Sequence, residues 1–282
     1  MLASRKLIVT AFLMFAAGSA RAQTTDGELQ WVNGEWERYW RVLQVGGDVA
    51  EHPWSMRPFG PEELTQLRAP GDHPWADRIM EKPFRFGRIE GATTPFDAQT
   101  IFNSAFPYGF NEGPVWAGRG LTSVVRGGAA IAVGPLSASF APVLFQAQNT
   151  RFELIPNGRD GRFAYGFAYP WATDMPQRFG DKPYRRLDPG NSFVRLDVGP
   201  VTAGFSTAAQ HWGPALEQPL VLGNNAGGFP HVFAGSAHPV RVGPVRIHGK
   251  MMWGKLYQSD YNDAVNPYRF AAGAWAHELP EH

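Results

Sequence analysis

The chain contains no cysteine, carries almost no net charge and has few lysines relative to arginines. The lack of cysteine excludes a disulfide framework. With 26 Lys and Arg against 25 Asp and Glu, the formal net charge is +1. This balance argues against a nucleic-acid-binding protein, which carries a basic surface, and against a disordered chain, which carries a high net charge. The abundant arginine and the 10 Trp suit planar, stacked recognition of a partner.

Long apolar runs are also scarce. One lies near the N-terminus, where Leu7–Ala17 is almost wholly apolar and follows the basic residues Arg5 and Lys6. Its 11 residues are fewer than the about 20 that a membrane-spanning helix needs. Ala20–Ala22 has the small residues of a cleavage site. We therefore expect residues 1–22 to be a signal peptide that exports the chain, and no other stretch has the length and apolarity of a transmembrane helix.

Residues 23–83 differ from the rest of the chain and read as short helices and loops. Glu28–Gln44 mixes Trp, Val and Leu with charged residues before Gly46, which predicts one short helix. Pro61–Leu67 has a proline at the first helical position and acids in the first turn, which predicts a second. We expect this part to be a small periplasmic segment.

From residue 84 onward the helical period gives way to a period of two. The pattern Val-Gly-Pro followed by Leu or Val occurs three times between alternating runs, starting at Val133, Val198 and Val242. Gly followed by Pro favours a tight turn. These patterns predict a further strand at Tyr268–Ala276 and three hairpins: Leu121–Val133 with Leu136–Gln148, Ser192–Val198 with Val201–Ala208, and His231–Val242 with Val245–Gln258.

The strands of these hairpins have one apolar and one polar face. In Val245–Trp253, apolar side chains alternate with Arg246, His248 and Lys250. Two environments fit so charged a face. In a soluble sandwich it would face water, whereas in an outer-membrane barrel it would face the lumen and the apolar side chains would face lipid.

Three features favour the barrel. Tight turns alternate with long connections, at 149–191 and 209–230, as in outer-membrane barrels. The runs of the first and third hairpins contain 12–14 residues, enough for the about 9–11 that cross a bilayer. Tyr and Trp cluster near strand ends. The predicted fold class is therefore all-β, an antiparallel transmembrane β-barrel over 84–282 with about eight to ten strands, preceded by a short helical segment.

Motifs for catalysis, metals and nucleotides are absent from the sequence or incomplete. Gly204–Ala208 lacks the second glycine of a nucleophile elbow and lies in a predicted strand. The eight His show no paired metal-ligand spacing, and no nucleotide-binding glycine motif occurs. We therefore expect no catalytic residues, no metal and no cofactor.

Aromatic, Arg and Asn residues in the long connections form a stronger pattern. Aromatic rings stack on the apolar faces of sugars, while Asn, Gln and Arg bond to hydroxyl groups, which is the chemistry of a polar-ligand site. The predicted ligand-binding residues are Tyr108, Trp116, Arg119, Trp171, Arg178, Trp212, Asn224 and Asn225.

Several segments resemble the Wzi capsule-assembly family of Gram-negative outer-membrane proteins. The likeness extends from about residue 28 to the end, and the segments that carry it are Asn103–Gly109, Trp116–Gly120, Tyr169–Trp171, Pro176–Gly180, Leu187–Gly190, Trp212–Pro214, Asn224–Ala226 and Phe229–Pro230. The resemblance implies an outer-membrane barrel with a periplasmic helical region, which holds capsular polysaccharide at the cell surface without catalysis. The expected partners are capsular polysaccharide, outer-membrane lipid and, during biogenesis, the barrel-assembly machinery.

Two other functions stay open at this stage. An oligosaccharide-diffusion porin predicts an open lumen, whereas the lectin-like function predicts a lumen blocked by side chains or by residues 28–68. A periplasmic polysaccharide-modifying enzyme is the third hypothesis. Members of the family are longer than this chain, so we expect either an N-terminal fragment of a larger barrel or a small barrel.

Overall fold

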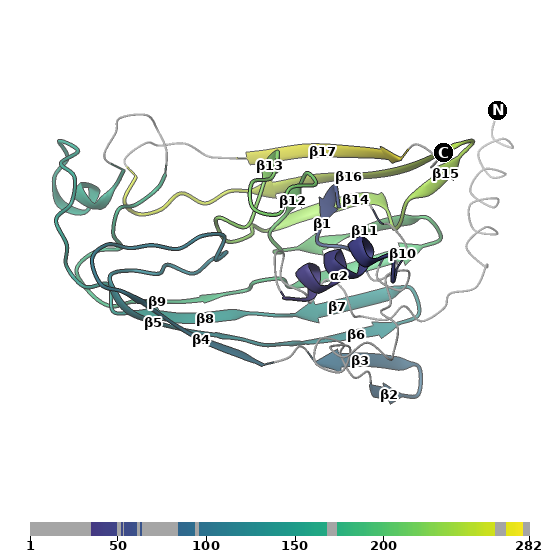
Figure 1. Cartoon of the computed structure of the whole chain (residues 1–282), viewed down its shortest axis with the longest axis horizontal. Helices are drawn as coiled ribbons and strands as arrows, with labels where there is room; N and C mark the ends of the chain where they lie inside the picture. Colours follow the sequence, from purple (N-terminus) through teal and green to yellow (C-terminus); the bar gives the residue numbers. More distant parts are fainter. Residues whose placement is uncertain are drawn as a thin grey trace, which may run out of the picture.

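The computed structural model describes residues 35–49, 52, 54–60, 63, 84–93, 96–167, 174–262 and 269–278 (Figure 1). The expected signal peptide, most of the second expected helix, and Trp171 lie outside the described residues. The chain is mainly antiparallel β-sheet with one longer helix, so the all-β class is confirmed. Among the helices described, none is long and apolar enough to cross a membrane.

The helices are α2 (Glu35–Gly46) and the 3₁₀ helix η1 (Gly161–Tyr165). The first agrees with the helix expected within Glu28–Gln44. The strands are β1 (Met56–Arg57), β2 (Phe84–Phe86), β3 (Ile89–Thr93), β4 (Asp97–Asn103), β5 (Gly120–Arg126), β6 (Ala129–Val133), β7 (Leu136–Phe140), β8 (Val143–Ala147), β9 (Tyr184–Asp188), β10 (Phe193–Val198), β11 (Val201–Ser206), β12 (His211–Trp212), β13 (Val221–Leu222), β14 (His231–Ser236), β15 (Val240–Val242), β16 (Val245–Lys255) and β17 (Arg269–Glu278).

The strands form three antiparallel sheets, the smallest of which has three strands in the order β1-β12-β13. A ten-stranded sheet has the path β15-β16-β14-β11-β10-β7-β6-β3-β2, with β17 on the other side of β16. A four-stranded sheet has the order β4-β5-β8-β9. Its strands β4, β5, β8 and β9 are adjacent in the chain to β3, β6, β7 and β10 of the ten-stranded sheet, respectively. Across the described residues, no pairing joins the two ends of this path into a closed barrel.

All three predicted hairpins are confirmed, with Val133 opposite Leu136, Val198 opposite Val201 and Val242 opposite Val245. The glycine of each turn has a positive φ, between 56° and 63°. A glycine with positive φ followed by proline matches a type II′ turn, whose twist suits two antiparallel strands. The local pattern is therefore sufficient to place these turns.

The predicted length of the strands in the first hairpin is wrong. Each run is divided in two, at Gly127–Gly128 and at Ala141–Pro142. A side chain at Gly128 would begin 2.2 Å from the carbonyl oxygen of Phe140, so the two backbones approach closely there. Pro142 has no N–H to donate to a neighbouring strand. The two short strands on either side of each break belong to different sheets.

The two faces of the sheets have inverted polarity relative to a soluble sheet. In β10 the residues Val194 and Leu196 are 50% and 46% exposed, whereas Arg195 and Asp197 are each 3% exposed. The same holds in neighbouring strands: the exposed residues include Leu121, Ile131, Val133, Leu136, Phe140, Leu144, Val201, Phe205, Val232, Ile247, Met251 and Trp253, and the buried ones include Glu90, Thr122, Ser137, Ser139, Thr202, Ser206, His231 and His248. In β10 the charged side chains thus lie on the buried face, which is the reverse of a soluble sheet with its charged face in water.

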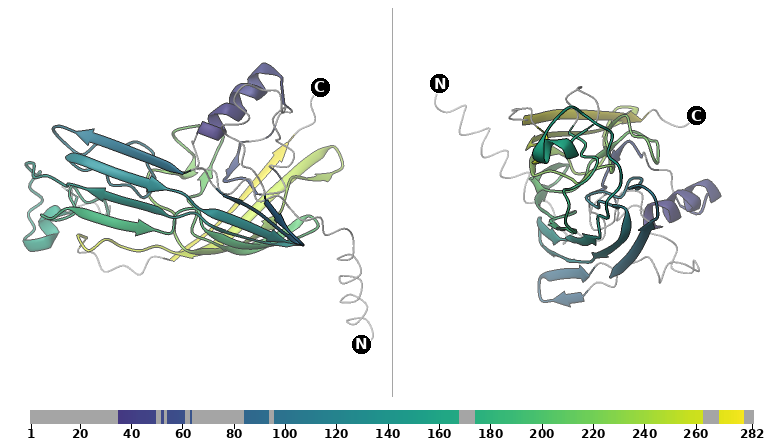
Figure 2. Two further views of the ribbon diagram at one scale, coloured as in Figure 1. Left: turned by 90° about the horizontal axis from the view of Figure 1, so that it is seen from below. Right: turned by 90° about the vertical axis from the view of Figure 1, so that its left-hand side faces the viewer.

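The N-terminal segment, residues 35–63 where described, covers part of this buried polar face. Seen end-on in Figure 2, the strands follow an arc that opens toward α2. Strand β1 pairs with β12. Arg57 bonds to Glu37 and donates to the carbonyl oxygens of Gly213 and Ala215 at 3.1 and 2.6 Å. Glu63 lies 3.4 Å from the Nδ1 atom of His248 in β16. Helix and sheet therefore form one packed unit.

Two apolar clusters fix the N-terminal segment. Tyr39, Trp40, Leu43 and Phe59 pack together within the segment. Met56 of β1 joins the second cluster, which belongs otherwise to the sheet and contains Trp212, Phe229, Phe233 and Met252. Between segment and sheet there is a cavity of about 20 Å³, lined by Arg57, Gly60, Glu63, Arg195, His248, Lys250 and others. That volume holds little more than one water molecule.

Candidate functional site

The long connections gather at one end of the sheet, opposite the Val-Gly-Pro turns (Figure 1). They are residues 104–119 between β4 and β5, residues 148–183 between β8 and β9 where described, and residues 256–262 after β16. Asp174 accepts hydrogen bonds from the Ser259 hydroxyl and amide, each at 2.5 Å. Tyr165 and Tyr261 make an edge contact at 5.8 Å. The three connections together are called the loop end here.

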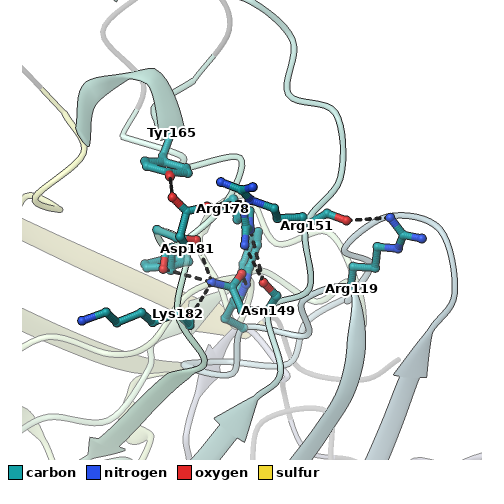
Figure 3. Close-up of polar contacts among 10 residues, drawn as sticks. Arg119, Asn149, Arg151, Tyr165, Arg178, Asp181 and Lys182 are labelled. Carbon is teal, nitrogen blue, oxygen red and sulfur yellow. Dashed lines mark hydrogen bonds and ion pairs between the residues drawn. The ribbon is translucent and has the colours of Figure 1, made fainter. Parts of the chain in front are cut away.

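Asn149 is the centre of the loop end. It is 1% exposed and has a φ of 54°, which asparagine tolerates better than most residues. Its Nδ2 donates to the carbonyl oxygens of Phe179, Gly180 and Lys182 at 2.9–3.0 Å. The side chain thus binds residue 149 to a segment 30 residues further along the chain (Figure 3).

Arg178 bonds back from this later segment to Asn149. Its Nε and Nη2 atoms donate to the carbonyl oxygen of Asn149 at 3.2 and 2.9 Å, and its Nη1 donates to Asp181 at 2.9 Å. Arg151 Nε donates to the same carboxylate oxygen at 3.2 Å. The Tyr165 hydroxyl donates to the other oxygen at 2.5 Å. Asp181 therefore holds three side chains at once.

This arrangement shifts the pKa values of two side chains, Asp181 and Tyr165. Hydrogen bonds from Tyr165 and then from Arg151 lower the pKa of Asp181 below its ordinary value of 3.8. The same bond to Asp181 is the main cause that raises the pKa of Tyr165 above its ordinary value of 10.0. At neutral pH the carboxylate is ionised and the phenol keeps its proton, so the hydrogen bond between them is maintained.

Aromatic rings pack next to these hydrogen-bonded residues. Phe179 stacks on Tyr184 at 4.3 Å and makes edge contacts with Trp116 at 4.9 Å and with Tyr261 at 5.6 Å. Trp116 also donates its indole N–H to the Asn149 Oδ1 at 3.4 Å. The loop end is consequently a packed structure with its own aromatic core.

Of the predicted ligand-binding residues, three lie in the connection 104–119. Tyr108 is 73% exposed. Arg119 donates to the carbonyl oxygens of Ser104 and Arg151. Trp116 is half-buried against Phe179 and serves mainly as support.

Asn224 and Asn225 belong to the connection between β13 and β14. Asn224 bonds to the Asn111 carbonyl oxygen at 2.8 Å, which ties this connection to 104–119. Asn225 is exposed. Their role in binding stays a prediction.

Two of the predicted residues are not accessible to a ligand. Arg178 is 3% exposed and all of its bonded nitrogens serve Asn149 and Asp181. Trp212 is 5% exposed and packs with Met56 and Met252 beneath the N-terminal segment. The prediction that either presents its side chain to a ligand is corrected accordingly, and both stabilise the fold.

Sequence reasoning missed Asn149, Arg151 and Asp181 as parts of this site. No local pattern marks them, since Asn149 bonds to Phe179 and Arg151 bonds to Asp181, in each case across about 30 residues. Within the described residues, no three His, Asp or Glu side chains gather as metal ligands. Ser206 of the incomplete elbow lies in β11, as predicted, and its hydroxyl donates to the carbonyl oxygen of Ser192 and to no base.

No protein-family model, curated protein or solved structure gives a significant match to the chain. The site must therefore be interpreted from its own geometry.

Proposed function

We propose that the chain is an outer-membrane protein that binds polysaccharide at its loop end and helps to assemble or retain capsular polysaccharide at the cell surface. The observation that carries this proposal is the inverted polarity of the sheet. Apolar side chains on the exposed face and polar side chains on the buried face are the arrangement of a transmembrane β-barrel.

The exposed face of the sheet is so apolar that contact with water would cost free energy. Apolar surface costs about 25 cal/mol for each Å² left in water, and soluble monomers rarely expose large contiguous apolar patches. Val194, Leu196 and Val198 lie on one such face, next to Val201 and Phe205 of the paired strand. Lipid is the solvent in which this face is stable, and the signal peptide expected at residues 1–22 would bring the chain to a membrane.

The N-terminal segment argues against a porin. A diffusion channel needs an open passage along the polar face. Instead the N-terminal segment lies over this face: β1 pairs with β12, Arg57 donates to the carbonyl oxygens of Gly213 and Ala215, and Glu63 contacts His248 of β16. A blocked polar face agrees with a binding function, in which the barrel is an anchor and the loop end makes contact with the ligand.

The loop end supports polysaccharide as the ligand. Its connections are held by side-chain hydrogen bonds and by an aromatic core, so that binding costs little ordering entropy. Tyr108 offers an exposed ring, and Arg119 lies in the same connection. The resemblance of the sequence to capsule-assembly proteins favours a capsular polysaccharide over other glycans.

The membrane location is tested with two substitutions of exposed leucines. We expect Leu144→Arg to prevent stable insertion, because Leu144 is 52% exposed in β8, away from the turns, and an arginine facing mid-bilayer lipid costs about 2–4 kcal/mol. Leu220→Arg is the matched control, because Leu220 is 83% exposed in the connection between β12 and β13. The readout is the heat-modifiable band of the folded barrel in outer-membrane fractions. Equal tolerance of both substitutions would contradict the proposal.

Binding is tested on an array of capsular polysaccharides. We expect Tyr108→Ala to weaken binding by up to about tenfold, because stacking on an aromatic ring is worth about 0.5–1.5 kcal/mol. Phe86→Ala is the control, since Phe86 is 79% exposed in β2 and lies away from the loop end. Absence of binding to every glycan on the array would refute a polysaccharide ligand.

A further inference from the structure

A row of polar side chains crosses the exposed face of the four-stranded sheet. Residues that pair across neighbouring strands share a face, and all members of one such row are exposed: Thr100, Ser123, Gln146 and Arg185. These four residues are called the polar row here. The next row on the same face lies two residues nearer the turn end and is apolar throughout: Ala98, Val125, Leu144 and Leu187. The apolar face therefore gives way to polar side chains at a defined level.

This level agrees with the thickness of a bilayer. Along β7 and β8 the exposed face carries Leu136, Phe140 and Leu144 before Gln146. Gln146 comes ten residues after Leu136, which at about 3.4 Å per residue corresponds to about 34 Å of strand. With a tilt of about 45°, such a strand crosses about 24 Å, and the apolar band of an outer-membrane barrel is about 25 Å tall. The polar row thus lies where the headgroups of one leaflet begin, on the side of the loop end.

Arg185 is the cation of the polar row. Its neighbour Arg186, on the opposite face of β9, pairs with Asp188 at 2.8 Å. Among the residues that the structure describes, none bonds to the Arg185 guanidinium. Beside it on the same face, Leu187 is 67% exposed. An arginine that faces lipid costs about 2–4 kcal/mol at the midplane but only about 0–1 kcal/mol near the interface, so this side chain fits the headgroup level.

The surroundings of Arg185 suit a phosphate group that is attached to acyl chains. Guanidinium binds phosphate through paired hydrogen bonds. Gln146 is the cross-strand partner of Arg185, and Ser123 is the partner of Gln146. Since the Cβ atoms of such partners are about 4.5–5.5 Å apart, the amide and the hydroxyl add donors next to the guanidinium. Leu144 and Leu187 lie directly on the turn side, where the acyl chains of the same lipid would pack.

We infer that Arg185, with Gln146 and Ser123, forms a binding site on the outside of the sheet for the phosphate headgroup of a membrane lipid. The inference rests on the membrane location in the proposed function and does not depend on the polysaccharide ligand. It also gives the orientation of the sheet, with the loop end beyond the leaflet that supplies this lipid.

The test uses the full chain in detergent and two lipids that differ only in phosphate. One is a lipid A with both of its phosphate groups, and the other is the same lipid after both groups have been removed. Native mass spectrometry measures how much of each lipid is retained as its concentration rises. We expect the phosphorylated lipid to bind at least tenfold more tightly, with a difference that falls as salt rises. Glucosamine phosphate, which lacks acyl chains, should not displace it.

Arg185→Gln should lose most of this difference while its heat-modifiable band shows that it is folded. Arg241→Gln is the matched control, because Arg241 is exposed in β15 at the turn end, and it should keep the difference. An unchanged difference in Arg185→Gln, or an equal loss in Arg241→Gln, would overturn the site.

Two results with the unmodified chain would also overturn the lipid site. One is equal retention of the two lipids, and the other is displacement of the phosphorylated lipid by glucosamine phosphate at the same concentration, which would indicate a site for soluble phosphates. Both results leave the proposed function intact, since the Leu144→Arg variant and the capsular array test the membrane location and the polysaccharide ligand separately.

Discussion

The two ends of the sheet are held together by different kinds of contact. At the turn end, three Val-Gly-Pro sequences each close a hairpin between residues three apart. At the loop end, Asn149 and Asp181 join segments about 30 residues apart through side-chain hydrogen bonds. Local sequence therefore determines one end and long-range contacts determine the other. We expect substitutions at the turn end to act on the stability of the whole sheet and substitutions at the loop end to act on binding.

The strongest test of this difference is Asn149→Ala. The substitution leaves three carbonyl oxygens without their donor and places alanine at a φ of 54°. Unpaired buried polar groups cost about 1–3 kcal/mol each, so we expect loss of polysaccharide binding with an intact sheet. Binding and the heat-modifiable band are measured side by side. Asn225→Ala, in an exposed position, should keep this loop structure. Parallel loss of the band and of binding would show that the two ends are not independent.

The second test concerns acid and the N-terminal segment. Burial alone would raise the pKa of Glu63, but the hydrogen bond from His52 and the nearby His248 hold it below its ordinary value of 4.5. The contribution of the ionised Glu63 carboxylate is therefore fully present above pH 4.5 and is lost as the pH falls through the lowered pKa. Hydrogen bonds to a charged group stabilise by about 1.5–3 kcal/mol.

Hydrogen exchange at residues 54–60 measures this release, because the Gly60 amide donates to Glu63 at 2.8 Å. After correction for intrinsic rates, protection should fall between pH 5 and pH 3. In Glu63→Gln the protection should be lower at pH 6 and nearly independent of pH. A similar pH profile in both proteins would assign the release to another group.

A smaller effect is expected at the turn end for Gly134→Ala. Gly134 has a φ of 58°, and a Cβ there would meet no atom within 4 Å. The cost is therefore the backbone strain alone, about 1–2 kcal/mol. Gly199 and Gly243 have the same surroundings and nearly the same φ, so the three alanine variants should lose equal stability in urea unfolding and keep ligand affinity. Unequal losses would mean that contacts beyond the turn matter at this end.

The smallest effect is expected for Asp181→Asn. Asp181 is half-exposed, so water and salt screen its charge. Asparagine keeps the shape and one accepting oxygen but cannot hold Arg151 and Arg178 by charge. We expect a slight change in polysaccharide binding and none in the stability of the sheet, measured by the affinity for the ligand and by urea unfolding. A loss of binding as large as that of Asn149→Ala would make Asp181 the centre of the loop end.

The predictable part of the fold is its local part. The alternating runs and the Val-Gly-Pro turns were sufficient for the hairpins and for the identity of the two faces, because a strand has a fixed period of two. They left open which face is exposed, since alternation is the same in a soluble sheet and in a membrane sheet. The burial of Arg195 and Asp197 answers that question through tertiary packing alone.

The candidate site was predicted only in part, for the same reason. Tyr108 and Arg119 lie at the loop end, as residue chemistry suggested. Trp212 has the same chemistry but packs beneath the N-terminal segment, whose position no local pattern reveals. Asn149 follows a strand as an ordinary polar residue, and its importance depends on residues 179–182.

The most direct test of the account measures which solvent the exposed face meets. The chain has no cysteine, so Leu196→Cys and Leu220→Cys each carry one spin label in protein reconstituted into lipid vesicles. If the exposed face meets lipid, the label at residue 196 collides more with oxygen, which is concentrated in lipid, than with a water-soluble nickel chelate. The label at residue 220 should show the reverse. A label at residue 196 that is more accessible to the nickel chelate would contradict the lipid-facing sheet, and with it the proposed location of the protein.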